Sequence, residues 1–350
     1  MQKPMPGKRG KPSRRVRLED LATKCGVSVS TASRALAGGK GVNPDLRAKI
    51  IEAAKELNYA VPTSVAGRQV LLVASSVAMV NDIRNQFTFQ VLDGINARSR
   101  VLGVEIVTRA IASPSELSEV LAEANDSPSI AGCLFLSLDD EELLSLSNAA
   151  TKPIVLVNGE DPYMRLSSVA PCNRAAARMA TQYLMQLGHR RILFLMRPGR
   201  QTIEHRLEGW RDAMKGHAGD WMSDYIVEVD DWLPELASQA IQTRIVERGL
   251  DFTAILAASD SLAVGATAGL TARNVNVPSD VSIIGMDDLP QSAFFNPPLT
   301  TVHIPMRDIG TASLELLLED LGGVKLPPRR VELACHIIER QSTDGVTAEL

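Results

Sequence analysis

From Val70 onward the chain repeats one pattern, in which a short apolar run is followed by a longer amphipathic segment. The apolar runs are rich in β-forming residues, as expected of parallel strands covered on both faces. They are Val70–Ala74, Val104–Val107, Ile130–Leu136, Ile154–Val157, Ile192–Met196, Ala254–Ala258 and Val281–Gly285. The helical stretches between them include Phe87–Leu102, Asn173–Leu187, Ile203–Lys215 and Leu233–Arg248. This alternation predicts right-handed crossovers and doubly wound sheets. Residues 70–350 exceed one such sheet, so we predict two α/β lobes.

Ligands in this architecture bind beyond the carboxyl ends of the strands, so the residues after each apolar run are the candidates. No enzyme motif occurs there: the sequence has no G-x-G-x-x-G, P-loop lysine, nucleophile elbow or histidine pair at metal-ligand spacing. The acidic run 139–142 is better explained as a solvated helix start than as a metal site. His189 is expected to make a structural bond in a turn. We therefore predict no catalytic residue, no metal and no cofactor.

The residues near the strand ends are instead suited to binding a sugar. Carboxylates, amides and an arginine can form paired hydrogen bonds with vicinal hydroxyls, and an aromatic ring can cover the apolar face of a pyranose. An aspartate after a strand is more often a helix cap or an ion-pair partner, so each residue alone is a weak signal. The candidates are Asn158, Arg206, Trp232, Ser259 and Asp287.

Residues 18–36 predict a different element, consisting of a helix, a tight turn and a second helix. Gly26 can supply the positive φ that a sharp turn needs, and Ser28 can cap the second helix. Ala32, Ala35 and Leu36 then face inward, whereas the outward residues would meet a DNA major groove. Those outward residues are Val29, Ser30, Ser33 and Arg34. An ordinary αα-hairpin is the alternative for these residues alone.

The neighbouring residues favour a DNA-binding head. Asn43-Pro44 is a strong helix start, so a third helix ending near Asn58 can close a three-helix unit. Residues 1–17 carry seven basic side chains and no acidic one, which suggests a disordered arm along phosphates or a solubilising tail. Residues 1–60 hold 13 Lys and Arg against 5 Asp and Glu, although the whole chain has a net charge of −4. A basic head on an acidic body is typical of a protein whose head binds nucleic acid.

No run reaches the roughly 18 apolar residues of a membrane span, and no hydrophobic segment follows the basic N-terminus. Cys25, Cys133, Cys172 and Cys335 lack metal-ligand spacing and are expected to be reduced thiols. We therefore predict a soluble cytoplasmic protein, associated with the nucleoid if it binds DNA.

Characteristic motifs occur in both parts of the chain. The head motif is Leu18-x-x-Leu21-Ala22-x-x-x-Gly26-Val27-Ser28-x-x-Thr31-x-Ser33-Arg34. The body motifs are 187–192 (LGHRRI), 206–210 (RLEGW), 281–288 (VSIIGMDD) and 297–302 (PPLTTV). From about Arg17 to Ser342, these motifs resemble those of the lactose/galactose-repressor family of transcription regulators.

The resemblance implies a homodimer on a palindromic operator in double-stranded DNA, with a periplasmic-binding-protein-like core that senses a sugar or sugar derivative. By position, DNA contacts and their supports are assigned to Arg17, Ser28, Val29, Ser30, Thr31, Ser33, Arg34 and Asn43. Effector-binding positions are Phe87, Thr88, Asn158, Arg206, Trp232, Ser259 and Asp287. Candidate dimer contacts on lobe one are Phe89, Val91 and Ile95. Asn158 and Ser259 depart from the Asp and Asn of many relatives, so the effector cannot be copied from any of them.

We expect an all-α helix-turn-helix head followed by an α/β core of two doubly wound lobes. The expected divisions are a basic arm (1–16), a head (17–59), a linker (60–69), a core (70–342) and a tail (343–350). Lobe one is expected at 70–170 and 305–325, and lobe two at 171–304 and 326–342. The linker has no leucine and contains Pro and Gly, so a stable hinge helix is doubtful.

We predict a repressor whose operator affinity is controlled by a small sugar-type effector. Two alternatives stay open. One is a cytosolic sugar-binding protein or enzyme with an unrelated helical cap. The other is a regulator controlled by a protein partner, which a core filled by its own side chains would favour.

Overall fold

The computed structural model describes residues 18–36, 42–56, 67–80, 85–216, 220–321 and 327–346. The chain divides into two compact units, residues 1–66 and 67–350, each of which is described by itself. The predicted basic arm with Arg17, the helix stop at Asn58, linker residues 60–66 and tail residues 347–350 lie outside the described residues.

The first unit is a three-helix head made of α1 (Leu18–Cys25), α2 (Val29–Leu36) and α3 (Pro44–Glu56). Gly26 adopts a φ of +67° between the first two helices, as the tight turn requires. Side chains from all three helices form a small core centred on Leu21, Ala35 and Ile50. The apolar residues recur at helical spacing in each segment, so each helix presents one apolar face to this core.

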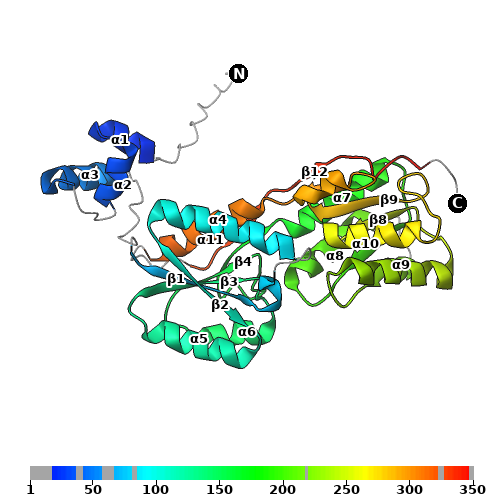
Figure 1. Cartoon of the computed structure of the whole chain (residues 1–350), viewed down its shortest axis with the longest axis horizontal. Coiled ribbons are helices and arrows are strands. Elements are labelled where there is room, and N and C mark those ends of the chain that lie inside the picture. Colours follow the sequence, from blue (N-terminus) through cyan, green and yellow to red (C-terminus); the bar gives the residue numbers. More distant parts are fainter. Residues whose placement is uncertain are drawn as a thin grey trace, which may run out of the picture. The chain divides into compact units, whose positions relative to one another are not determined.

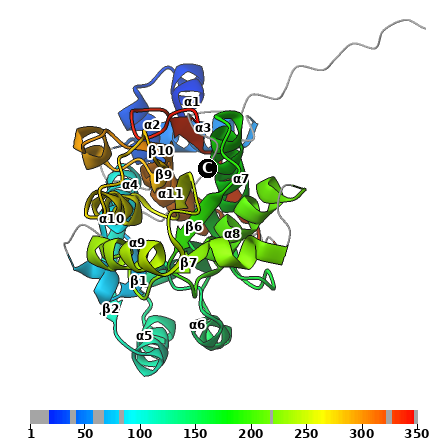
Figure 2. The same cartoon turned by 90° about the vertical axis from the view of Figure 1, so that its right-hand side faces the viewer.

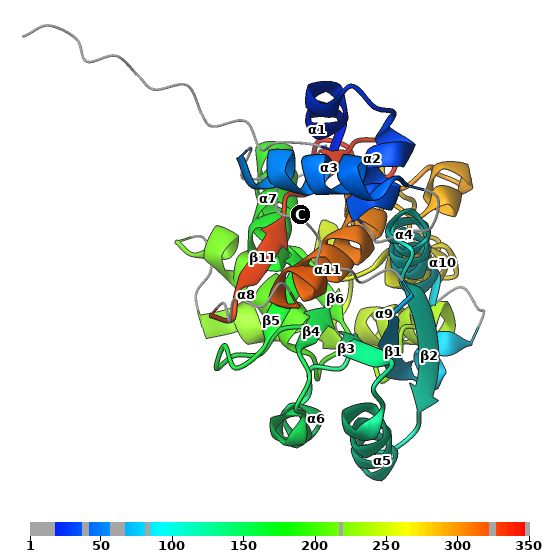
Figure 3. The ribbon, with the colours of Figure 1, turned by 90° about the vertical axis from the view of Figure 1, so that its left-hand side faces the viewer.

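In the second unit, the first of two sheets runs in the order β11-β5-β4-β3-β1-β2. Its strands are β1 (Gln69–Ser75), β2 (Glu105–Ile111), β3 (Ile130–Leu136), β4 (Ile154–Val157), β5 (Ser167–Pro171) and β11 (Arg330–Leu333). All pairings in this sheet are parallel. Figure 3 shows α4 (Gln86–Leu102) and α11 (Met306–Asp320) on one face, with α5 (Pro114–Asp126) and α6 (Glu141–Leu146) on the other. Both faces are thus covered, which explains the apolar strands.

The second sheet runs in the order β12-β10-β9-β8-β6-β7. Its strands are β6 (Ile192–Met196), β7 (Ile226–Glu228), β8 (Ala254–Ala257), β9 (Ser282–Asp287), β10 (Thr300–His303) and β12 (His336–Ile338). β12 alone pairs antiparallel within the described residues. In Figure 2, α7 (Asn173–Gln186) and α8 (Gln201–Met214) lie on one side, and α9 (Pro234–Arg248) and α10 (Asp260–Thr271) on the other.

The chain passes between the two lobes three times, at residues 171–173, 303–306 and 333–336, which we call the crossover segments (Figure 1). One lobe assignment was wrong. Residues 330–333 form β11, which pairs with β5 in the first sheet, whereas we expected all of 326–342 in lobe two. The chain returns to the second sheet only at β12, because the last crossover segment begins at Leu333.

The expected architecture of a helix-turn-helix head and two doubly wound lobes is confirmed. Two predicted dimer contacts were wrong, however. Val91 and Ile95 are fully buried within the chain, where α4 packs against α11 so closely that a Cβ on Gly310 would lie 2.2 Å from the Val91 carbonyl oxygen. Within the described residues, no helix is long and apolar enough to cross a membrane.

Candidate functional site

A cavity of about 600 Å³ lies between the two lobes. Its walls come from the carboxyl ends of β1, β3 and β4 in the first sheet and of β6, β8 and β9 in the second. This is the edge at which doubly wound sheets bind ligands. The cavity is large enough for a mono- or disaccharide-sized molecule, since ligand pockets typically span about 300–1,000 Å³.

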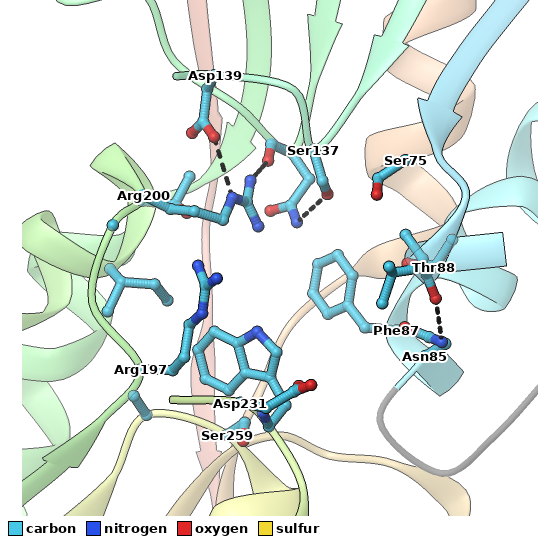
Figure 4. A pocket seen from close by; sticks show the side chains of 18 of the residues that line it. Ser75, Asn85, Phe87, Thr88, Ser137, Asp139, Arg197, Arg200, Asp231 and Ser259 are labelled. Carbon is cyan, nitrogen blue, oxygen red and sulfur yellow. Dashed lines mark hydrogen bonds and ion pairs between the residues drawn. The ribbon is translucent and has the colours of Figure 1, made fainter. Parts of the chain in front are cut away.

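All seven residues that the sequence assigned to an effector line this cavity. They are Phe87, Thr88, Asn158, Arg206, Trp232, Ser259 and Asp287. In Figure 4, Phe87 points into the cavity from the lobe-one side, facing Arg197 and Arg200. The aromatic side chains of Phe87 and Trp232 are each half-buried. The cavity therefore combines apolar ring faces with charged and amide groups.

Arg206 is the most deeply buried cation of the site, at 4% exposure. Its guanidinium donates to the Asn173 Oδ1 at 2.8 Å and to the Ala258 carbonyl, and its Nη1 lies 3.9 Å from the Asp287 Oδ1. Burial lowers the pKa of Arg206, against the attraction of Asp287. Burial likewise raises the pKa of Asp287 well above its ordinary value. A ligand hydroxyl that donates to Asp287 would stabilise its carboxylate form.

The backbone around Asp287 is held in place by a buried carboxylate beneath it. Asp260, 1% exposed, accepts hydrogen bonds from the Ser292 and Thr301 hydroxyls, each at 2.5 Å, and from the Leu289 N–H at 3.0 Å. Asp287 itself has a φ of +147°, which an L-residue adopts only when its surroundings enforce it. The network holds Leu289, two residues beyond Asp287, and the Asp260 N–H donates to the Asp287 Oδ2 at 3.4 Å.

Arg200, which sequence analysis missed, connects the two lobes across the cavity. From the start of α8 in lobe two, its Nε donates to the Asp139 Oδ1 of lobe one at 3.0 Å, and its Nη2 donates to the Asn158 carbonyl (Figure 4). Asp139 is 4% exposed, and its Oδ2 has no hydrogen-bond partner within the described residues. We call Arg200, Asp139 and Asn158 the interlobe clamp.

The acidic run 139–142 combines two roles. Asp140 caps α6 by accepting from the Leu143 N–H at 2.9 Å, as the predicted helix start requires. Asp139 instead turns inward to the clamp. Asp139 and Arg197 both follow apolar strands, so the rule that selected Asn158 would have found them too. Arg197 donates to its neighbour Pro198, within its own lobe.

Several predicted residues also have structural roles. Ser259 accepts from the Leu262 N–H at 3.2 Å and so caps α10, while the Asn158 amide donates to the Ser137 hydroxyl at 3.2 Å. Asn158 has a φ of +51°, so it adopts a backbone conformation that asparagine tolerates better than most residues. His189 bonds to Thr253 and to the Asp344 carbonyl, which agrees with the predicted structural role.

A second ionic cluster joins the lobes beside the cavity. The buried Glu160 of lobe one lies 3.2 Å from the Arg330 Nη1 on β11 and 3.2 Å from the His205 Nε2 on α8. The contact with the Glu160 carboxylate raises the pKa of His205. This cluster therefore favours the present separation of the lobes most when His205 is protonated.

In the head, the predicted recognition helix α2 exposes Val29, Ser30 and Arg34, and Ser33 and Thr31 are half-buried. Ser28 accepts from the Thr31 N–H at 3.1 Å, which caps α2. Asn43 caps α3 by accepting from the Asp45 N–H at 2.8 Å. The exposed face of α2 thus carries one arginine, one hydroxyl and one apolar side chain, which can contact guanine, either base edge and a thymine methyl, respectively.

Comparisons with known proteins agree with both parts of this description. Residues 17–61 match the family model of bacterial regulatory proteins of the lacI family, and residues 181–343 match a periplasmic binding protein-like domain. A curated regulator from Streptomyces limosus, an HTH-type transcriptional regulator in the aml 5′ region, is 31% identical over 340 residues. The alignment covers 93% of this chain and 94% of that protein.

Two solved structures are similar over nearly the whole chain. The transcriptional regulator CelR–cellobiose complex has a TM-score of 0.71 at 28% identity, covering 94% of this chain and 100% of the other. The lac repressor dimer bound to operator and the anti-inducer ONPF has a TM-score of 0.68 at 25% identity, covering 95% and 100%.

Proposed function

We propose that this chain, which belongs to the lacI family of bacterial regulatory proteins, represses transcription. We propose further that a sugar-type effector controls this repression. Membership makes the chain a DNA-binding transcriptional regulator. The effector occupies the cavity between the lobes, and its binding changes the affinity of the head for operator DNA.

The observation that carries the proposal is the meeting of Arg206 and Asp287 beneath a cavity lined by both lobes. A guanidinium and a carboxylate 3.9 Å apart can bind adjacent hydroxyls, because the guanidinium donates to one hydroxyl oxygen and the carboxylate accepts from the other hydroxyl. Phe87 and Trp232 offer ring faces for the apolar side of a sugar. The cellobiose bound to the similar CelR supports this ligand class.

A ligand can control DNA binding only if it prefers one arrangement of the lobes. The interlobe clamp provides such a difference, because Arg200 reaches Asp139 and Asn158 only while the lobes are close. Typical coupling energies of about 1–3 kcal/mol would change operator affinity by about 5- to 150-fold.

For the DNA side, we propose a homodimer whose paired heads bind a palindromic operator. The similar lac repressor structure, a dimer bound to operator, supports this proposal. Arg34 would make the bidentate guanine contact, and Val29 and Ser30 would read neighbouring bases. Ser28, Thr31, Ser33 and Asn43 would position the helix and contact phosphates. Arg17 is proposed to contact phosphate from the start of the head.

The test uses two matched arginine variants of the full-length protein. A panel of neutral sugars and sugar acids is first screened for ligands that raise the melting temperature. Arg34→Ala should abolish binding to a genomic operator fragment and keep the ligand-induced rise. Arg206→Lys keeps the charge but not the planar fork, and should bind the operator yet lose the rise and the response to ligand.

An unchanged ligand response in Arg206→Lys would remove Arg206 from the effector site. Normal operator binding by Arg34→Ala would contradict the assignment of the recognition helix.

Control by a protein partner alone is the second candidate that the sequence left open. It would be favoured by a core whose pocket is filled with side chains. The cavity of about 600 Å³ favours a small ligand instead.

A further inference from the structure

Two cysteines lie on different crossover segments and converge on one backbone atom. Cys172 lies between β5 and α7, and Cys335 lies between β11 and β12. The Leu333 carbonyl oxygen accepts from the Cys172 N–H at 2.9 Å and lies 3.7 Å from the Cys335 Sγ. Residues far apart in sequence thus bring two cysteines to the same carbonyl oxygen.

The surroundings make Cys172 the reactive member of this pair. Cys172 precedes the first residue of α7, where the partial positive charge of the helix N-terminus stabilises a thiolate. The neighbouring Cys335 thiol lowers the pKa of Cys172 to about 6, whereas burial raises the pKa of Cys133 to about 11. Cys172 and Cys335 are both partly exposed, and Cys133 is buried. An oxidant should therefore react first at Cys172.

We propose that Cys172 and Cys335 form a redox-modification site, at which hydrogen peroxide oxidises the two thiols to a disulfide between two crossover segments. The Cys172 thiolate attacks the peroxide oxygen, becomes a sulfenic acid and releases water after protonation. Cys335 then attacks that sulfur, the S–S bond forms, and the departing hydroxide takes up the Cys335 proton as a second water. Two thiols are oxidised by two electrons, and the peroxide is reduced to two waters.

The position of the two cysteines on crossover segments means that a disulfide would affect movement of the lobes. Movement of two lobes is absorbed by the few residues that connect them. A disulfide here would tie two of the three crossover segments together and restrict that movement. The inference concerns the hinge and holds whichever effector the cavity takes.

The test treats the reduced full-length protein with one equivalent of hydrogen peroxide and counts thiols in denaturant. The count should fall from the four cysteines of the chain to two, and dithiothreitol should restore it. Peptide mapping without reductant should recover Cys172 linked to Cys335. In the oxidised protein, amides of residues 172–173 and 334–336 should exchange hydrogen several-fold more slowly.

The matched control is Cys25→Ser, which should still lose two thiols, whereas Cys172→Ser and Cys335→Ser should yield no linked peptide. At pH 7, iodoacetamide should label Cys172 on the order of tenfold faster than Cys25. A sulfinic acid on Cys172 without the cross-link, or a disulfide between two chains, would overturn the proposal. So would unchanged amide exchange in a fully cross-linked sample.

Discussion

Removing the guanidinium of Arg200 should shift the core toward a more open arrangement of its lobes. Arg200→Ala deletes both clamp bonds, to the Asp139 carboxylate and to the Asn158 carbonyl. The matched control is Arg197→Ala, which removes the same charge from the same cavity but no bond between lobes, because Arg197 donates to Pro198 of its own lobe.

The expected change in free energy follows from the burial of Arg200 and Asp139. The side chains of Arg200 and Asp139 are 18% and 1% exposed, so the pair is largely removed from water. Hydrogen bonds to charged groups contribute about 1.5–3 kcal/mol each. Because the adjoining cavity lets water reach Asp139 once the lobes part, we expect about 2 kcal/mol in total rather than the full sum. That corresponds to roughly a 30-fold shift between closed and open populations.

Small-angle X-ray scattering of the ligand-free proteins measures this shift as an increase in radius of gyration. Arg200→Ala should scatter as a more extended molecule than both the unsubstituted protein and Arg197→Ala. Equal radii for all three proteins would refute the clamp, as would a larger effect of the Arg197 substitution.

Two further predictions concern stability. Because Glu160 raises the pKa of His205, their contact should stabilise the protein fully below the ordinary histidine pKa of about 6.5 and be lost as pH rises through the raised value. Urea midpoints should show His205→Asn costing more at about pH 5.5 than at about pH 8.5, and a pH-independent difference would contradict this. Gly209→Ala would place a Cβ 2.1 Å from a carbonyl oxygen of α7, so overpacking of about 1–3 kcal/mol should lower the melting temperature by several degrees. Gly345→Ala, whose Cβ would have a nearest neighbour at 3.7 Å, should leave the melting temperature unchanged.

The strands that could be predicted from the sequence are those buried on both faces. β3 and β6 appear as uninterrupted apolar runs, and their bounds agree with the prediction. β5 (Ser167–Pro171) has the same complete burial, yet it begins with two serines, and its pairing with β4 and β11 decides its structure. β11 is a half-exposed edge strand, so its membership of the first sheet depends on a partner distant in the chain.

Prediction of the candidate site from the sequence has the same limit, because it too depends on partners that are distant in the chain. Asn158 and Asp287 were found because they follow apolar strands, and Arg206 because it lies in a recognisable helix motif. Asp139 follows a strand too, but its acidic neighbours favoured a solvated helix start. Its partner Arg200 lies 61 positions further along the chain, so only the folded structure brings the two side chains together. Local pattern identifies candidate residues, whereas pairing across the cavity is a property of the fold.

The threefold passage between lobes also bears on how such regulators can be recombined. Each sheet is completed by strands from distant parts of the chain, since β11 and β12 follow one another yet join different sheets. A chimaera that exchanges one lobe by a single splice would therefore leave both sheets with a missing or foreign strand. The boundary at Ala66 and Gly67 is different, because it is the one place where the chain passes from the first unit to the second. New pairings of operator and effector are thus most readily made by grafting whole heads onto whole cores.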